Sequence, residues 1–138
     1  MADLKITELT ETTDNENIII PVVQSSANRR ISEKSLGLVK FNTETANYIL
    51  ELTDANLCVE MNVGSGNTCT VPPNTDVAFP VGTQIEIMQL GAGQTTIVAG
   101  SGVTLRSANG LKITDQYAGC VITKRDTNEW YVVGSLEV

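Results

Sequence analysis

The sequence predicts a mainly β protein: an antiparallel β-sandwich or barrel-like domain preceded by an extended N-terminal arm with one short helical turn. Two observations predict this fold. Charged residues make up 18% of the 138-residue chain, below the usual share of about 25%, and Thr, Ser, Asn, Gln and Gly take their place. Short apolar runs also recur every roughly ten residues between turn signals, and no segment keeps a helical periodicity.

Residues 1–40 are expected to form an attachment or oligomerisation arm. This region is rich in charge, and its two short apolar stretches are too small to make a core of their own. The second stretch contains Pro21, which cannot donate a ladder hydrogen bond, so it suits an edge strand or a docking segment. Ser32 and Gly37 suit the two ends of a single helical turn. The residues expected to make the arm's contacts are Leu4, Ile6, Leu9, Ile18, Ile19, Ile20, Val22 and Val23.

Residues 41–138 are expected to form a β-domain that the arm displays. Runs such as 84–90 alternate apolar and polar residues, as half-buried strands do. Asn109-Gly110 is the strongest hairpin signal in the chain, and a second hairpin is predicted around the turn before Trp130. The expected strands lie at 48–52, 57–63, 68–71, 84–90, 95–99, 103–106, 111–113, 119–125 and 129–134.

The charge balance argues against nucleic acid as a partner. The net charge is −7, whereas a protein that grips nucleic acid needs a basic stripe to displace counterions. The close basic pairs, Arg29-Arg30 and Lys124-Arg125, have acidic neighbours and suit a solvated surface. The longest apolar runs are far shorter than the ~20 residues that cross a bilayer, so we expect no membrane partner.

Residue types needed for common catalytic and metal sites are missing or scattered. The sequence has no His, which removes Ser-His-Asp and Cys-His arrangements and most zinc sites. Cys58, Cys69 and Cys120 are widely spaced, and the first and last lie in apolar runs, so we expect small buried side chains in a protein made in a reducing cytosol. No catalytic residue, metal site or cofactor is predicted, and we expect the chain not to be an enzyme.

Glycine-rich and acidic segments were the remaining candidates for a ligand site. The turns at 64–66, 91–93 and 100–102 resemble fragments of phosphate loops, but lack the following helix and the Gly-Lys-Ser/Thr ending. We interpret them as hairpin turns. The acidic run 14–17 lacks the ligand spacing of a calcium loop, and the carboxylates between 55 and 110 are too sparse to suggest a paired acid and base.

The second region carries several motifs in a familiar order. The run from Val71-Pro-Pro-Asn to Phe79-Pro-Val-Gly continues through Gln89-Leu-Gly-Ala-Gly and ends with Glu129-Trp-Tyr-Val-Val-Gly. Together these motifs, from about residue 48 to the end, resemble a β-domain common in structural proteins of tailed bacteriophages. The arm motifs, Lys5-Ile-Thr-Glu-Leu, Ile20-Pro-Val-Val-Gln and Arg30-Ile-Ser, look like the N-terminal segment of phage fibre and appendage proteins.

This resemblance implies a structural component of a virion, made in the host cytoplasm. Such a protein would dock to other virion proteins of the capsid or tail through its arm and would form a homo-oligomer, often a trimer. Because the sequence ends with the β-domain at Gly134-Ser-Leu-Glu-Val, without a fibre shaft or receptor-binding tip, we favour a capsid decoration or head-appendage role over a tail fibre or baseplate.

Two other functions stay open from the sequence. The first is a carbohydrate- or receptor-binding module of a phage tail fibre, although such sites need exposed aromatics and this chain has one Trp, three Tyr and two Phe. The second is a small glycan-cleaving enzyme, which the missing His and the sparse carboxylates disfavour.

Overall fold

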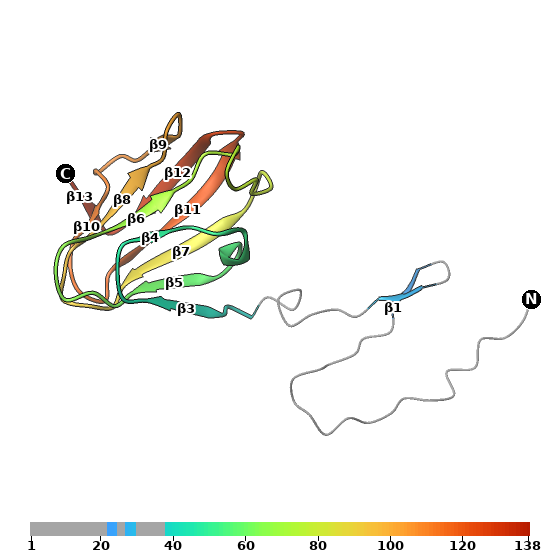
Figure 1. The fold of residues 1–138 in the computed structure, drawn as a ribbon, viewed down its shortest axis with the longest axis horizontal. Helices are drawn as coiled ribbons and strands as arrows, with labels where there is room; N and C mark the ends of the chain where they lie inside the picture. Colours follow the sequence, from blue (N-terminus) through green and yellow to red (C-terminus); the bar gives the residue numbers. More distant parts are fainter. Residues whose placement is uncertain (1–21, 25–26, 30–37) are drawn as a thin grey trace, which may run out of the picture. The chain divides into compact units, whose positions relative to one another are not determined.

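The computed structural model describes residues 22–24, 27–29 and 38–138 of the chain (Figure 1). In the first part, β1 (Val22–Gln24) and β2 (Ala27–Arg29) form an antiparallel pair. The helical turn predicted near Ser32 lies outside the described residues, so it stays a prediction.

Residues 39–138 form a separate unit built from two sheets (Figure 1). The first sheet has six strands in the order β3-β5-β7-β11-β12-β9, and the second has five in the order β13-β10-β8-β6-β4. The mainly β fold predicted from the sequence is therefore confirmed. The elements are β3 (Phe41–Glu44), β4 (Tyr48–Ile49), the 3-10 turn η2 (Leu52–Asp54), β5 (Cys58–Met61), β6 (Asn67–Val71), β7 (Gln84–Gln89), β8 (Thr95–Ala99), β9 (Thr104–Arg106), β10 (Lys112–Ile113), β11 (Gly119–Asp126), β12 (Glu129–Gly134) and β13 (Leu136–Glu137).

The first six strands of this unit wind as three stacked coils. The chain passes from one sheet to the other after every strand, so β3, β5 and β7 lie parallel in one sheet and β4, β6 and β8 lie parallel in the other. In the six-stranded sheet Phe41 lies opposite Cys58, which in turn lies opposite Glu86. Each strand of the second and third coils thus pairs with the corresponding strand of the preceding coil.

The antiparallel pairing predicted from the sequence applies to the last part of the chain. β7, β11 and β12 are antiparallel neighbours, as are β8, β10 and β13. The predicted hairpin before Trp130 is confirmed as β11–β12, with a register shift between Lys124 and Asp126. β9 returns to the six-stranded sheet and lies parallel to β12. Both sheets are therefore mixed.

The hairpin predicted at Asn109-Gly110 is wrong. β9 and β10, the strands on either side, belong to different sheets and do not pair with each other. Gly110 has the positive φ of 99° that made the dipeptide resemble a hairpin turn, but here that conformation guides the chain from one sheet to the other. A turn signal reports the local backbone angle and leaves the pairing partner undetermined.

The glycine turns at 64–66, 91–93 and 100–102 are likewise connections between the sheets, and the hairpins predicted there are wrong. The turns at 64–66 and 91–93 stack on each other: the Gly93 N–H donates to the Val63 carbonyl, next to the first turn, at 2.9 Å. A Cβ added at Gly91 or Gly93 would collide with the backbone of Val63 or Ser65, respectively. These glycines therefore permit two successive coils to approach closely.

The two sheets enclose one apolar core. Strand alternation supplies it: Ile85 and Ile87 of β7 are fully buried, while Gln84 and Glu86 between and beside them are exposed. The largest aromatic contact is an edge-to-face pair between Phe79 and Trp130, with ring centroids 5.5 Å apart. The other buried apolar residues are Leu50, Val59, Met61, Cys69, Val71, Ile97, Ile113, Cys120, Ile122, Val132 and Leu136.

Candidate functional site

The arm residues predicted as an attachment site fall mostly outside the described residues. This applies to Leu4, Ile6, Leu9, Ile18, Ile19 and Ile20. Val22 and Val23 lie in β1, where they pair with Arg29 and Asn28 of β2. Their role in attachment stays a prediction.

A buried carboxylate lies at the first coil. Asp54, at the end of η2, is 1% exposed and accepts hydrogen bonds from the Tyr48 hydroxyl at 2.9 Å, the Asn42 amide at 3.0 Å and the Glu51 backbone N–H at 2.8 Å. Burial, followed by the hydrogen bond to Asp54, raises the pKa of Tyr48 well above its usual value. The bonds join β3, β4 and η2, so the carboxylate holds the first coil together.

A second buried polar group lies where the next two coils turn. Asn67 and Thr95 are register partners on β6 and β8, and the Thr95 hydroxyl donates to Asn67 Oδ1 at 2.9 Å. The Asn67 amide donates to the carbonyls of Ser65 and Gly93, and the Thr95 N–H donates to Gln89 Oε1. These side chains satisfy the buried backbone of the two stacked glycine turns, which is a structural use.

Lys124 is a lysine within the core, 2% exposed. Its ammonium donates to Asn74 Oδ1 at 2.6 Å and to the Phe79 carbonyl at 2.8 Å, and it lies 5.8 Å from the centroid of the Trp130 ring. Burial lowers the pKa of Lys124 below its usual value. Both acceptors belong to the irregular segment between β6 and β7, so Lys124 ties that segment to β11.

The three cysteines, all within the described range, are free and buried. Burial raises the pKa of Cys58 to about 11, with smaller contributions from Glu86 and Glu60, and it raises the pKa of Cys120 to about 12. Burial also raises the pKa of Cys69 far above its usual value. Because the thiolate is the reactive form, these thiols suit packing, as the sequence predicted, and do not suit nucleophilic catalysis.

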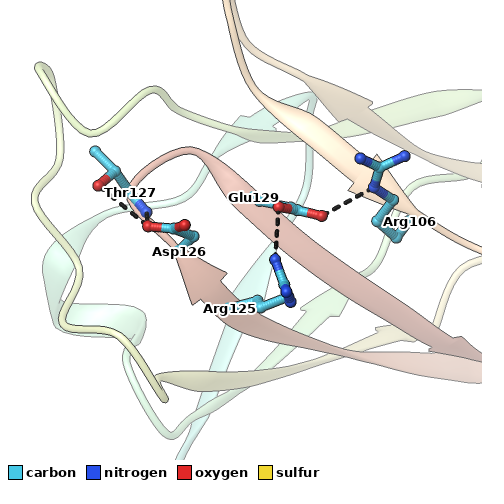
Figure 2. A network of polar contacts seen from close by, with 5 residues as sticks. All are labelled: Arg106, Arg125, Asp126, Thr127 and Glu129. Atoms are coloured by element: carbon cyan, nitrogen blue, oxygen red, sulfur yellow. Dashed lines mark hydrogen bonds and ion pairs between the residues drawn. The ribbon is translucent and has the colours of Figure 1, made fainter.

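A network of exposed charges lies at one corner of the six-stranded sheet. Figure 2 shows the Glu129 carboxylate between two guanidinium groups: Arg106 Nε donates to it at 2.9 Å, and so does one Arg125 nitrogen. The hydrogen bond from Arg106 is the main cause that lowers the pKa of Glu129. The Arg125 guanidinium also lies 5.9 Å from the centroid of the Tyr131 ring. The three strands β9, β11 and β12 together build this corner.

Beside this corner the outer face of the sheet is apolar. Val121 of β11 is paired with Val133 of β12, and the two are 39% and 70% exposed. Tyr131, the next outward residue of β12, is 45% exposed. Sequence reasoning missed this face because it assigned the large residues of these strands to the core. The sequence does contain a signal for this face, because residues 119–125 and 129–134 place apolar side chains on both sides of their strands.

The described residues contain no group of three or more His, Cys, Asp or Glu side chains that could hold a metal ion. In this same part of the chain no helix has the length and apolar character that a membrane span requires. No protein-family model matches the chain, and no curated protein or solved structure is significantly similar to it. The exposed apolar side chains of β11 and β12 and the charge network beside them make the outer face of the six-stranded sheet the candidate functional site.

Proposed function

We propose that this chain is a non-enzymatic structural component of a tailed-phage virion. Its arm docks to other virion proteins of the capsid or tail, and its β-domain is displayed as part of a homo-oligomer. Within this proposal, a capsid decoration or head-appendage role is favoured over a tail fibre or baseplate role. The proposal begins from the motifs that resemble phage structural proteins, and the use of the buried polar groups supports it.

One observation carries the proposal: the chain uses its buried ionisable groups to hold backbone segments together. The Asp54 carboxylate binds Tyr48 and the Glu51 N–H, and the Lys124 ammonium binds the Phe79 carbonyl. A catalytic site aims such groups at a space that a substrate can enter. Here they hold neighbouring segments of the two-sheet domain together, which suits a structural role.

Phe79 and Trp130 give the proposal further support. Both belong to motifs on which the resemblance rests, and their rings pack edge to face in the core. Lys124 bonds to the carbonyl of one and lies beside the ring of the other. The resembling motifs thus coincide with a joint between the irregular segment and the β11–β12 hairpin.

The direct test is incorporation into particles. The full chain and a chain that lacks residues 1–40 would each be expressed during infection by a phage that carries this protein. We expect mass spectrometry of purified particles to find the full chain and not the truncated one, while both fold in the cytoplasm. Particles that contain neither form, or that contain both equally, would contradict the proposal.

A carbohydrate- or receptor-binding module is the second candidate. Three aromatic side chains support it by their exposure: Phe41 at 67%, Tyr117 at 69% and Tyr131 at 45%. A glycan array separates the two candidates. Specific binding that disappears in Tyr117→Ala or Tyr131→Ala would favour the module, and an array without binding favours the structural role.

A further inference from the structure

The strand registers fix which side chains share the outer face of the six-stranded sheet. One row across the sheet consists of Val133, Val121, Glu86, Cys58 and Phe41, which are successive pairing partners. The neighbouring row consists of Arg106, Tyr131, Thr123 and Gln84. Because paired residues point to the same side of a sheet, both rows lie on the outer side of the sheet. Cys58 is the buried member of these rows, at 1% exposed, whereas Phe41, Glu86, Val121 and Val133 beside it are exposed.

One corner of this face is acidic. Glu86 lies on β7 and Glu60 on the adjacent β5. Thr43 of β3 is paired with Glu60 and donates a hydrogen bond of 2.7 Å to its carboxylate. Glu86 is paired with Cys58, and Glu60 is the next residue of β5 on the same face as Cys58. The two charges therefore lie close together, on the side of the sheet that includes β3.

The opposite corner holds two guanidinium groups. Arg106 and Arg125 each commit one nitrogen to Glu129, and an arginine carries five N–H donors, so both can bind a second carboxylate (Figure 2). Three strand steps separate β7 from β9, which places Arg106 about 14 Å across the sheet from Glu86. Arg125 lies on β11, next to β7, but four residues beyond Val121, the partner of Glu86, which is about 13 Å along the strand. The acidic and basic corners are thus distinct regions of one face.

Apolar side chains fill the centre between the two corners. Val121, Val133 and Tyr131 lie there, and each is more than a third exposed. Contiguous exposed apolar groups framed by charged ones are typical of a protein–protein contact, and Tyr and Arg are among the residues enriched at the centres of such contacts. The face therefore has an apolar middle and charged corners of opposite sign.

We propose that this face pairs with the same face of a second copy of the chain about a two-fold axis. The inference rests on the proposed function, in which the chain assembles with itself, and it names the surface. A two-fold axis within the interface, passing close to Val121 and Thr123, exchanges the two corners. Glu60 and Glu86 of each copy then meet Arg106 and Arg125 of the other, while the apolar centres meet each other. Such an interface is self-complementary and closes as a dimer.

Charge reversal provides the test, with the full chain in solution. An acid-reversed variant carries Glu60→Lys and Glu86→Lys, and a base-reversed variant carries Arg106→Glu and Arg125→Glu. Light scattering of the native chain is expected to give the mass of two chains. Each variant alone places like charges opposite each other at both contacts, so its dimer should weaken by a factor on the order of 100. An equimolar mixture of the two variants should restore the dimer, because their contacts are again of opposite sign.

The mixture distinguishes a lost interface from a lost fold, because two misfolded chains would not restore each other. The matched control carries Asp76→Lys and Asp115→Lys, two exposed carboxylates that lie in loops and not on the strands of this face, and should remain a dimer. A native chain that is a monomer or a trimer, a mixture that stays monomeric, or a control that also dissociates would overturn the inference.

Particle incorporation is measured separately: a monomer that still enters particles would refute this interface alone, and a dimer that never enters them would refute the virion role alone.

Discussion

The Tyr48 hydroxyl donates a hydrogen bond of 2.9 Å to the buried carboxylate of Asp54, six residues further along the chain. This bond closes the first coil, because Asn42 of β3 donates to the same carboxylate at 3.0 Å. One side chain thus connects a strand of each sheet with the turn that follows.

Removing the Asp54 carboxylate should loosen the first coil. Asp54→Ala leaves three donors without their acceptor in a buried site, and we expect the free energy of unfolding to fall by about 3 kcal/mol. Tyr48→Phe removes one donor to Asp54 and the hydroxyl that accepts from Asn42 at 3.2 Å, but it keeps the other two bonds to Asp54, so it should cost less, about 1.5 kcal/mol. Urea unfolding monitored by Trp130 fluorescence measures both. Equal losses for the two variants would contradict the shared-acceptor arrangement.

The stacked glycine turns predict that the same Gly→Ala substitution has very different effects on stability at Gly93 and at Gly66. A Cβ at Gly93 would collide with the backbone of Ser65, whereas a Cβ at Gly66 meets nothing within 4 Å. We therefore expect Gly93→Ala to destabilise the domain by about 3 kcal/mol and Gly66→Ala to change stability little. The melting temperatures of the two variants compare them directly. A Gly93→Ala protein as stable as the native one would show that the coils do not stack so closely.

Lys124 should contribute more to the stability of the fold than an exposed lysine does. Lys124→Ala removes the two hydrogen bonds of a buried ammonium group and leaves a cavity beside Trp130, so we expect the free energy of unfolding to fall by about 3 kcal/mol. The exposed Lys112→Ala is the control and should have little effect. Hydrogen exchange adds a local measure, because the segment between β6 and β7 should exchange faster in Lys124→Ala. Unchanged exchange in that segment would argue against the role assigned to Lys124.

The buried thiols predict a loss of stability in alkaline solution. The pKa of Cys58 is about 11 in the folded protein and 9.0 in its ordinary state, so the unfolded chain releases its proton first. The unfolded chain then binds fewer protons, and the free energy of unfolding falls as the pH rises above 9.0. Cys58→Ala should make this decline less steep. Urea unfolding at several pH values measures the slope, and an unchanged slope would mean that Cys58 ionises freely in the fold.

The sequence allowed the strands to be predicted well and their partners poorly. Alternation locates β7 and β12, because each strand must bury every second side chain. The same pattern is compatible with parallel and antiparallel neighbours, so Asn109-Gly110 and the glycine turns were assigned to hairpins that do not form. β3 (Phe41–Glu44) was missed, since a short polar edge strand lacks an alternating apolar signal.

The candidate site was harder to predict than the fold. Glu86 and Val121 are 35 positions apart in the sequence and become neighbours only when β7 pairs with β11. Arg106 and Tyr131 meet through the parallel pairing of β9 with β12, which no local signal reveals. Exposed apolar residues of a strand also look like core residues in sequence. Surface sites of this kind depend on pairing between distant strands.

The three-coil stack also gives the first coil a protective role. β3 and β4 cover the edges of β5 and β6, which would otherwise expose rows of backbone donors and acceptors to other chains. β3 is short and polar, so it ends the stack without inviting further growth. The chain therefore carries its own cap, as terminal repeats do in solenoid proteins. A cut at residue 40 would leave that cap in place, and a cut after η2 would turn a closed domain into a template for aggregation.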